Sequence, residues 1–165
     1  MAKIGLACNE KQIMRAELEA RGIAVTDDAL EEFDTSLTIE ALTRAFVSLG
    51  HKVEVLGWGR MLLRGLSMTE VDLVFNIAEG VGGRSREAQV PAVLEMMGVP
   101  WVGSDATALG VSLDKDLTKR LVQAAGVRVP RGFLATKPEE ARAECAKRCI
   151  QFPVIVKPNG HPVSA

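Results

Sequence analysis

The chain has 165 residues, of which 47% are hydrophobic and 25% are charged, a composition that excludes disorder and is typical of one globular domain with the start of another. Its 20 Lys and Arg residues stand against 21 Asp and Glu residues without basic runs, which argues against nucleic-acid binding and favours small ligands. Within residues 1–22, the apolar run before charged residues resume is only about five residues long. We therefore expect neither a signal peptide nor a membrane span, and we expect a cytoplasmic location.

Six short apolar runs predict β-strands. They are Lys3–Ala7, Lys52–Leu56, Val71–Asn76, Trp101–Val102, Gly132–Leu134 and Pro153–Val156. Most of them lack the alternation of a half-exposed strand, as expected for strands that are covered on both faces. Because helical patterns separate them, the sequence predicts an α/β fold with a Rossmann-like parallel sheet and helices on both faces.

Four segments between these strands have helical spacing. Thr38–Leu49 is closed by Gly50, and the run REAQVPAVLEMMG predicts a helix that begins near Pro91 or is kinked there. A third helix is expected from Ser112 to Ala125, with Ser112 as N-cap and a buried stripe of Leu117, Leu121 and Ala125; a fourth covers PEEARAECAKRCI. The acidic residues 24–35 are weakly patterned and indicate an insertion or a mobile loop.

The three cysteines do not indicate disulfides, because their number is odd and Cys145 and Cys149 lie one turn apart on the expected fourth helix. A metal pair is the alternative for these two thiols. No His or third Cys accompanies them at ligand spacing, so the sequence favours an ordinary helix with reduced cysteines.

A change in composition near residues 129–132 divides the chain. We expect a Rossmann-like domain at 1–128 and the start of a second domain at 129–165. The second part has one predicted strand, a helix and another strand, which cannot bury a core alone. Its strand Val154–Val156 is expected to be buried and to present Lys157 at its C-terminal edge, where ligands bind in open α/β sheets.

A glycine cluster in VDLVFNIAEGVGGRSREAQ lies directly between a strand and a helix. Gly80, Gly82 and Gly83 would let backbone amides approach a substrate or an anion at the helix N-terminus. A plain tight βα turn is the alternative. A dinucleotide fingerprint would need a third glycine where Ser85 stands, and it would normally follow the first strand.

Two lysines are candidates for phosphate binding. Lys115 stands in the first turn of the expected third helix, where a cation is mildly unfavourable, so a ligand would explain it. Solvation is the alternative for this lysine, with Asp116 and Arg120 forming an exposed pair four residues apart. Lys157, expected at a ligand edge, favours the first interpretation, since two lysines can neutralise a polyphosphate as point charges.

The motifs NIAEG, GVPWVGSD, SLDKDLTKRL and FPVIVKP, in this order, resemble the N-terminal part of D-alanine:D-alanine ligase and its relatives in the ATP-grasp superfamily. The resemblance covers about residues 71–158. It implies an ATP-dependent carboxylate–amine ligase, in which an acyl phosphate is captured by an amine and catalysis is largely positioning and charge neutralisation. It also implies a pre-ATP-grasp domain followed by an incomplete, truncated ATP-grasp subdomain.

By this resemblance, Lys115 and Lys157 would bind ATP phosphates, and Glu79 and Gly80 would line the pocket of the first substrate with Gly82 and Gly83. The ligases usually have His-Gly where Glu79 and Gly80 stand, and a carboxylate there would favour a cationic group. The chain also departs from the family in its first loop, CNEKQIMRAE, and after Lys157-Pro158. The residues that follow do not include the family's Gly/Ser-rich phosphate loop or its magnesium ligands.

We therefore expect the N-terminal fragment of such a ligase, inactive alone, without catalytic residues or a metal site of its own. ATP with magnesium would serve the complete enzyme, and this chain would hold none tightly. Expected partners are an amino-acid-like substrate and either a second copy or a missing C-terminal half, with no nucleic acid and no membrane. The alternatives are a non-catalytic Rossmann-like module that binds a small ligand or a partner, and a nucleotide-dependent oxidoreductase.

Overall fold

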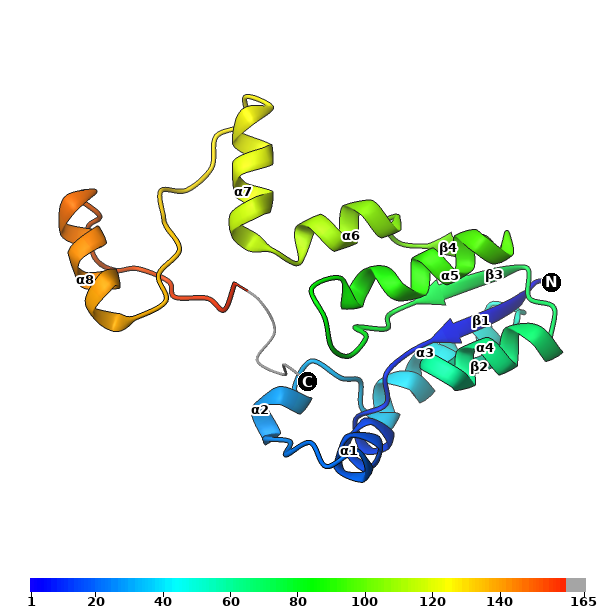
Figure 1. Ribbon diagram of the computed structural model, residues 1–165. Helices are drawn as coiled ribbons and strands as arrows, with labels where there is room; N and C mark the ends of the chain where they lie inside the picture. The colour runs from blue at the N-terminus through cyan, green and yellow to red at the C-terminus, as the bar shows by residue number, and fades with distance from the viewer. Residues whose placement is uncertain (160–165) are drawn as a thin grey trace.

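The computed structural model describes residues 1–159, and its core is a four-stranded parallel sheet (Figure 1). The strands are β1 (Lys3–Ala7), β2 (Lys52–Gly57), β3 (Leu73–Asn76) and β4 (Trp101–Val102). The helices are α1 (Lys11–Ala20), α2 (Asp27–Leu30), α3 (Ser36–Ser48), α4 (Gly59–Met68), the 3-10 turn η1 (Arg86–Ala88), α5 (Gln89–Met97), α6 (Ala106–Ser112), α7 (Lys115–Ala124) and α8 (Pro138–Lys147).

The strand order β2-β1-β3-β4 places β1 and β3 at the centre. In the register, Ile4 of β1 pairs with Val53 of β2 and with Leu73 of β3, and Val74 of β3 pairs with Trp101 of β4. The chain winds outward in one direction from β1 to β2 and in the other from β3 to β4. The C-terminal ends of β1 and β3 therefore flank a topological switch point, where ligands bind in folds of this kind.

Helices cover both faces of the sheet, as predicted. On one face, Ala7 and Val74 pack against Leu62 of α4 and Leu94 of α5. On the other face, Leu6 packs against Ile39 of α3, and the rings of Phe46 and Phe75 meet edge to face with centroids 5.2 Å apart. Burying side chains of this size contributes about 1.5–3 kcal/mol each, so the stability of the fold resides in this layered core.

Burial of the strands differs from the prediction in one respect. Only β1 is buried along nearly its whole length, whereas β2 is an edge strand in which Val55 is exposed and Leu56 is buried. An edge strand has one neighbour, so α3 and α4 cover it incompletely. The apolar run Val53–Leu56 could not distinguish a central strand from an edge strand.

The acidic segment 24–35, which was expected to be an insertion or a mobile loop, contains the short helix α2 and packs against α1. Thr26 caps α2 by accepting a hydrogen bond from the backbone N–H of Ala29, and Leu30 and Phe33 are buried against Met14 of α1. The buried apolar residues of this segment are Ala29, Leu30 and Phe33; Phe33 lies three and four residues after the other two, about one helical turn, and all stand among acidic neighbours. The segment forms an ordered lobe beside the C-terminal end of β1.

The predicted third helix, Ser112–Ala125, corresponds to α7, and α6 before it was not predicted. α6 begins after Asp105 and α7 after Asp114, and the carboxylate of each accepts a hydrogen bond from a backbone N–H of the first turn. Asp114 is thus the N-cap that the sequence assigned to Ser112. The expected buried stripe of α7 is also wrong, because Leu121 is exposed and no residue of this helix is fully buried. Pro91 lies in the first turn of α5, as predicted, where its missing N–H costs no hydrogen bond.

The last two predicted strands do not form in the described part of the chain. Neither 132–134 nor 153–156 is paired, and Ile155 and Val156 are 84% and 90% exposed. A strand needs a partner for its backbone hydrogen bonds, and the sheet formed within residues 1–159 includes only β1 to β4. Figure 1 shows α7 and α8 standing away from the sheet, with this extended segment returning beneath them.

Within residues 1–159, no helix is long and apolar enough to cross a membrane. The cysteines of the described structure are all free, and Cys8 is buried behind β1. The expectation of reduced cysteines is therefore confirmed for Cys145 and Cys149 on and after α8.

Candidate functional site

The candidate substrate loop lies at the topological switch point of the sheet. Asn9 directly follows β1, is 1% exposed, and accepts a hydrogen bond through Oδ1 from the backbone N–H of Gly80 at 2.9 Å. The same side chain donates to Sδ of Met14 at 3.2 Å. This amide therefore ties the loop after β3 to the end of β1, and the predicted residues Glu79 and Gly80 lie where the fold places a ligand.

All three predicted loop glycines have left-handed backbone angles. The φ values of Gly80, Gly82 and Gly83 are 69°, 72° and 83°. At Gly80 space is also limiting, because a Cβ there would lie 2.3 Å from the carbonyl oxygen of Arg86. No atom would crowd a Cβ at Gly82 or Gly83, so these two leave an open stretch of backbone beside the loop.

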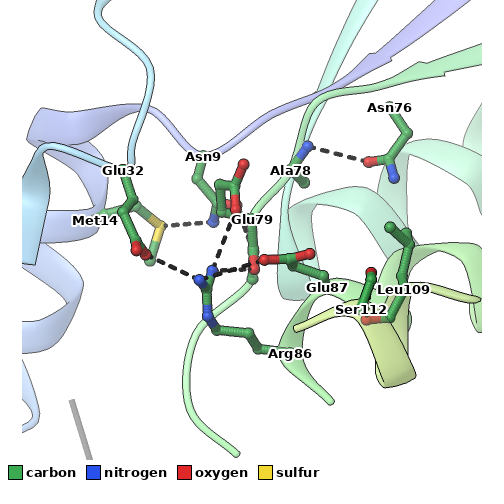
Figure 2. Close-up of polar contacts among 11 residues, drawn as sticks. Asn9, Met14, Glu32, Asn76, Ala78, Glu79, Arg86, Glu87, Leu109 and Ser112 are labelled. Atoms are coloured by element: carbon green, nitrogen blue, oxygen red, sulfur yellow. Dashed lines mark hydrogen bonds and ion pairs between the residues drawn. The ribbon is translucent and has the colours of Figure 1, made fainter. Parts of the chain in front are cut away.

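A buried arginine organises the loop from below, as Figure 2 shows. Arg86 is 3% exposed, and its Nη1 donates to the backbone carbonyl of Glu79 at 2.6 Å and lies 3.4 Å from that residue's carboxylate. Its Nη2 lies 2.9 Å from the Glu32 carboxylate and 3.4 Å from that of Glu87. One guanidinium thus joins the acidic lobe, the substrate loop and the turn η1, while its Nε has no hydrogen-bond partner among the described residues.

Negative charge is in excess around Arg86. Burial raises the pKa of Glu79, and the nearby charge of Glu87 raises it further, against the opposing charge of Arg86. Burial also raises the pKa of Asp34, with a contribution from Glu79. Because Glu32, Glu79 and Glu87 share the single guanidinium of Arg86, an additional positive group would be favoured beside Glu79.

The first turn of α7 is the second part of the candidate site, and Asp114 is its centre. The Asp114 carboxylate accepts hydrogen bonds from the backbone N–H of Leu117 at 3.0 Å and the side-chain amide of Asn159 at 3.1 Å. It also lies 3.3 Å from Nη2 of Arg84, which follows the loop glycines. Hydrogen bonding from Leu117 first, and then from Asn159, lowers the pKa of Asp114.

Both predicted lysines are close in the sequence to residues that take part in these contacts. Lys115 is exposed in the first turn of α7, and Lys157, also exposed, lies two positions before Asn159, which binds Asp114 and the backbone N–H of Asp116. The prediction that Lys157 ends a buried strand is wrong, since 153–156 is not a strand. Asp116 and Arg120 form the ion pair that belonged to the alternative of a solvated Lys115, with 2.8 Å between charged atoms.

Reasoning from sequence missed Asn9, Glu32, Arg86, Asp114 and Asn159 as organising residues. A buried charge among apolar neighbours has no periodic signal, and the partners of Arg86 come from three separate segments. Asp114 could have been found, since Asp followed by Lys-Asp-Leu at a helix start is a common capping pattern.

The two predicted phosphate-binding lysines are both exposed. Lys115 directly follows Asp114, and Lys157 stands two residues before Asn159. Within residues 1–159, no group of three or more His, Cys, Asp or Glu side chains is placed to hold a metal ion. The magnesium ligands that the resemblance implies are therefore not among the residues described.

Known proteins share both sequence and fold with this chain. The D-alanine–D-alanine ligase of Moorella thermoacetica is 32% identical over 124 residues, which are 71% of this chain and 39% of that ligase. The ligase of Corynebacterium jeikeium is 38% identical over 94 residues, 57% of this chain and 24% of its own length. An uncharacterized protein of Sinorhizobium fredii, y4sG, is 40% identical over 86 residues, 52% of this chain and 24% of that protein. No protein-family model matches.

This chain resembles the N-terminal part of D-alanine–D-alanine ligases. The crystal structure of the Bacillus anthracis ligase matches 98% of the chain with a TM-score of 0.61 at 18% identity, and the chain covers 47% of that protein. The VanG D-Ala:D-Ser ligase of Enterococcus faecalis matches 92% of the chain with a TM-score of 0.52, also at 18% identity, and half of that protein is covered. At these identities the structures show the α/β fold, which confirms the predicted fold class.

The chain spans between about a quarter and two-fifths of the length of the curated ligases and about half of the solved ones. One matching structure is a Bacillus anthracis ligase complexed with ATP. Similarity to these ligases therefore concerns a ligase-like portion, and the activity of a whole enzyme requires an argument of its own.

Proposed function

We propose that this chain supplies the substrate loop and two phosphate-binding lysines of an ATP-dependent carboxylate–amine ligase. The observation that supports this most is the convergence on Asp114. Arg84 beside the glycine loop, the first turn of α7 and the segment of Lys157 all contact this one carboxylate. Residues assigned to substrate and residues assigned to nucleotide thus lie around one helix terminus.

In this proposal, Lys115 and Lys157 bind the phosphates of ATP, as point charges that neutralise the polyphosphate. Gly82 and Gly83 leave backbone beside the ligand, and Gly80 holds the loop close to Arg86. The carboxylate of Glu79 accepts hydrogen bonds from the ammonium group of an amino-acid-like substrate, because negative charge is in excess around Glu79.

The reaction proceeds in two balanced steps. A substrate carboxylate oxygen forms a bond to the γ-phosphorus as the bond between that phosphorus and the β,γ-bridging oxygen breaks, which yields an acyl phosphate and ADP. The amine of a second substrate then forms a C–N bond and loses a proton while inorganic phosphate leaves. This chain's residues bind and orient the substrates, and residues 1–159 include no cluster of side chains that would hold magnesium.

We also propose that residues 1–128 form the Rossmann-like domain and that 129–165 begin a second one. α8 and the extended segment after it stand apart from the sheet (Figure 1). On this basis the chain alone is inactive, holds ATP only weakly, and acts in the cytoplasm together with a C-terminal half or a second copy. Limited proteolysis should cut first in the exposed segment 125–128.

Calorimetric titration with MgATP tests the nucleotide assignment. We expect weak, saturable binding by the wild-type chain, with a Kd in about the millimolar range, and at least about fivefold weaker binding by Lys115→Ala and by Lys157→Ala. Arg120→Ala is the matched control, because it removes a cation of α7 that already pairs with Asp116. Equal affinities in all variants, or no binding by the wild-type chain, would refute the assignment.

One observation favours a second candidate function, a non-catalytic partner-binding module. Phe152, Ile155 and Val156 are exposed on one short segment, and an apolar surface of this kind is typical of an interface. Sedimentation of the wild-type chain beside Ile155→Ser distinguishes the two. A dimer that Ile155→Ser dissociates, without any MgATP binding, would support the module.

A further inference from the structure

A cavity of about 340 Å³ lies between α7 and the chain that leads to α8. Its walls are Lys119 and Gln123 of α7, the segment 129–132, and Arg148 and Ile150 just after α8. This volume falls in the range of small-molecule pockets, about 300–1,000 Å³. The cavity contains neither Lys115 nor Lys157 among its lining residues, so it is separate from the proposed nucleotide site.

The described lining of the cavity carries three cations and no acid: Lys119, Arg131 and Arg148. Lys119 and Arg131 have no carboxylate partner within residues 1–159. Arg148 pairs with Glu144, but the same carboxylate also lies 3.4 Å from the ammonium group of Lys147. Positive charge is therefore in excess around the cavity, and an anion would relieve the repulsion among these groups.

Contacts with backbone and an aromatic ring fix the positions of these cations. Nη2 of Arg131 donates to the carbonyl oxygen of Arg148 at 2.7 Å, which ties the segment 129–132 to the end of α8. The guanidinium of Arg148 lies 5.5 Å from the ring centroid of Phe133. The ammonium group of Lys119 reaches over the backbone of Gly132, where a Cβ would lie 2.5 Å from Nζ.

The rest of the lining suggests the kind of anion. Val129, Pro130 and Ile150 form an apolar wall, and Gln123 adds a neutral hydrogen-bonding group. Guanidinium groups match phosphate geometry through their planar fork of N–H donors. A bare ion would leave the apolar wall unused, so the lining fits a phosphate group attached to a compact apolar group.

We propose that this cavity binds a small phosphate monoester, with Lys119 and Arg131 as its anion-binding residues. The site is independent of the nucleotide assignment of Lys115 and Lys157. The bound ester would bridge α7 and the segment before α8, and it would thereby fix the orientation of the second part of the chain relative to the first.

Titration with phenyl phosphate and with inorganic phosphate, followed by amide NMR, tests this proposal. We expect saturable shifts of residues in 119–132 and 148–150, with phenyl phosphate binding at least about threefold tighter than inorganic phosphate. Lys119→Gln and Arg131→Gln should each weaken phenyl phosphate binding by about tenfold. Arg120→Gln is the matched control, with the same change of charge on the same helix, and Lys115→Ala should retain full affinity.

Three outcomes would overturn the proposal. One is the absence of saturation by phenyl phosphate up to about 10 mM. Another is an equal loss of affinity in Arg120→Gln and Lys119→Gln, which would indicate a non-specific effect of net charge. The third is a loss in Lys115→Ala, which would place the ester in the proposed nucleotide site. Circular dichroism of each variant verifies that α7 and α8 remain folded.

Discussion

The side-chain amide of Asn159 donates a hydrogen bond to Oδ1 of Asp114 at 3.1 Å, and its carbonyl oxygen accepts one from the backbone N–H of Asp116 at 2.8 Å. Two residues 45 positions apart in the sequence thus form a two-point contact at the start of α7. The contact joins the segment that carries Lys157 to the first turn of α7, which carries Lys115.

Replacing Asn159 with Ala should weaken MgATP binding by about three- to tenfold, because the segment that carries Lys157 would no longer be joined to the first turn of α7. α7 should persist, since Asp114 still accepts the hydrogen bond from Leu117 that caps it. Calorimetry measures the affinity and circular dichroism the helix content. Thr136→Ala, which removes the hydrogen bond from the Thr136 hydroxyl to Glu140 of α8, is the control. Unchanged affinity in Asn159→Ala would show that the contact does not organise the lysines.

Gly80→Ala should destabilise the fold more than Gly83→Ala. Both residues have left-handed φ, which costs a non-glycine residue about 1–2 kcal/mol. At Gly80 the new Cβ would also collide with the carbonyl oxygen of Arg86, whereas at Gly83 it would meet open space. We expect a loss of at least about 2 kcal/mol for Gly80→Ala and about 1 kcal/mol for Gly83→Ala, measured by urea unfolding. Equal losses would mean that the loop relaxes away from Arg86.

Glu79→Gln should stabilise the protein at neutral pH. Because burial raises the pKa of Glu79, the folded chain binds this proton more tightly than the unfolded chain does. The free energy of unfolding therefore falls as pH rises from the unfolded pKa, 4.5, through the raised pKa, and the ionised carboxylate is a net cost above it. Gln removes that cost.

Urea unfolding of Glu79→Gln and wild-type protein at about pH 7.5 and about pH 4 checks this prediction. The gain should be present at the higher pH and absent at the lower one. Glu54→Gln, the same substitution at an exposed position on β2, is the matched control. A gain that is equal at both pH values would assign the effect to packing and not to charge.

Cys149 should react with a thiol reagent before Cys8 does. Cys149 is exposed, whereas Cys8 is buried and its pKa is raised to about 11 by burial, with Asp34 and Glu10 contributing. Only the thiolate attacks, so Cys8 should remain unmodified in the folded protein at about pH 8 and react on unfolding. Mass spectrometry of labelled peptides measures the order. Rapid labelling of Cys8 in folded protein would contradict the packing of β1 against α3.

The sequence predicted correctly those elements whose local pattern of apolar residues matches their burial in the fold. The bounds of β1 and β4 were predicted correctly, and α5 begins near Pro91 as its ring geometry requires. The position of the glycine loop after β3 also followed from local pattern. Identification of the two lysines as candidates needed only their places near helix and strand ends, although their roles stay predictions.

What the sequence could not provide depends on contacts between distant segments. The run Val154–Val156 has the composition of a buried strand, but a strand exists only with a neighbour, and local composition does not reveal one. The carboxylates that pair with Arg86 belong to three segments: the segment after α2, the loop after β3 and the turn η1. In the acidic segment 24–35, Leu30 and Phe33 are buried against α1. The sequence pattern did not reveal this, because most neighbours of these two apolar residues are charged.

The exposed run Val154–Val156 is bounded by Pro153 and Pro158. Apolar extended segments with free N–H and C=O groups are templates for intermolecular pairing, and proline cannot donate a hydrogen bond to a neighbouring strand. A second strand could therefore pair with only the four residues from Val154 to Lys157, the last of which carries a charge. The two prolines thus act as gatekeepers, and they should keep this chain dispersed at concentrations where an uninterrupted apolar strand of the same exposure would form fibrils.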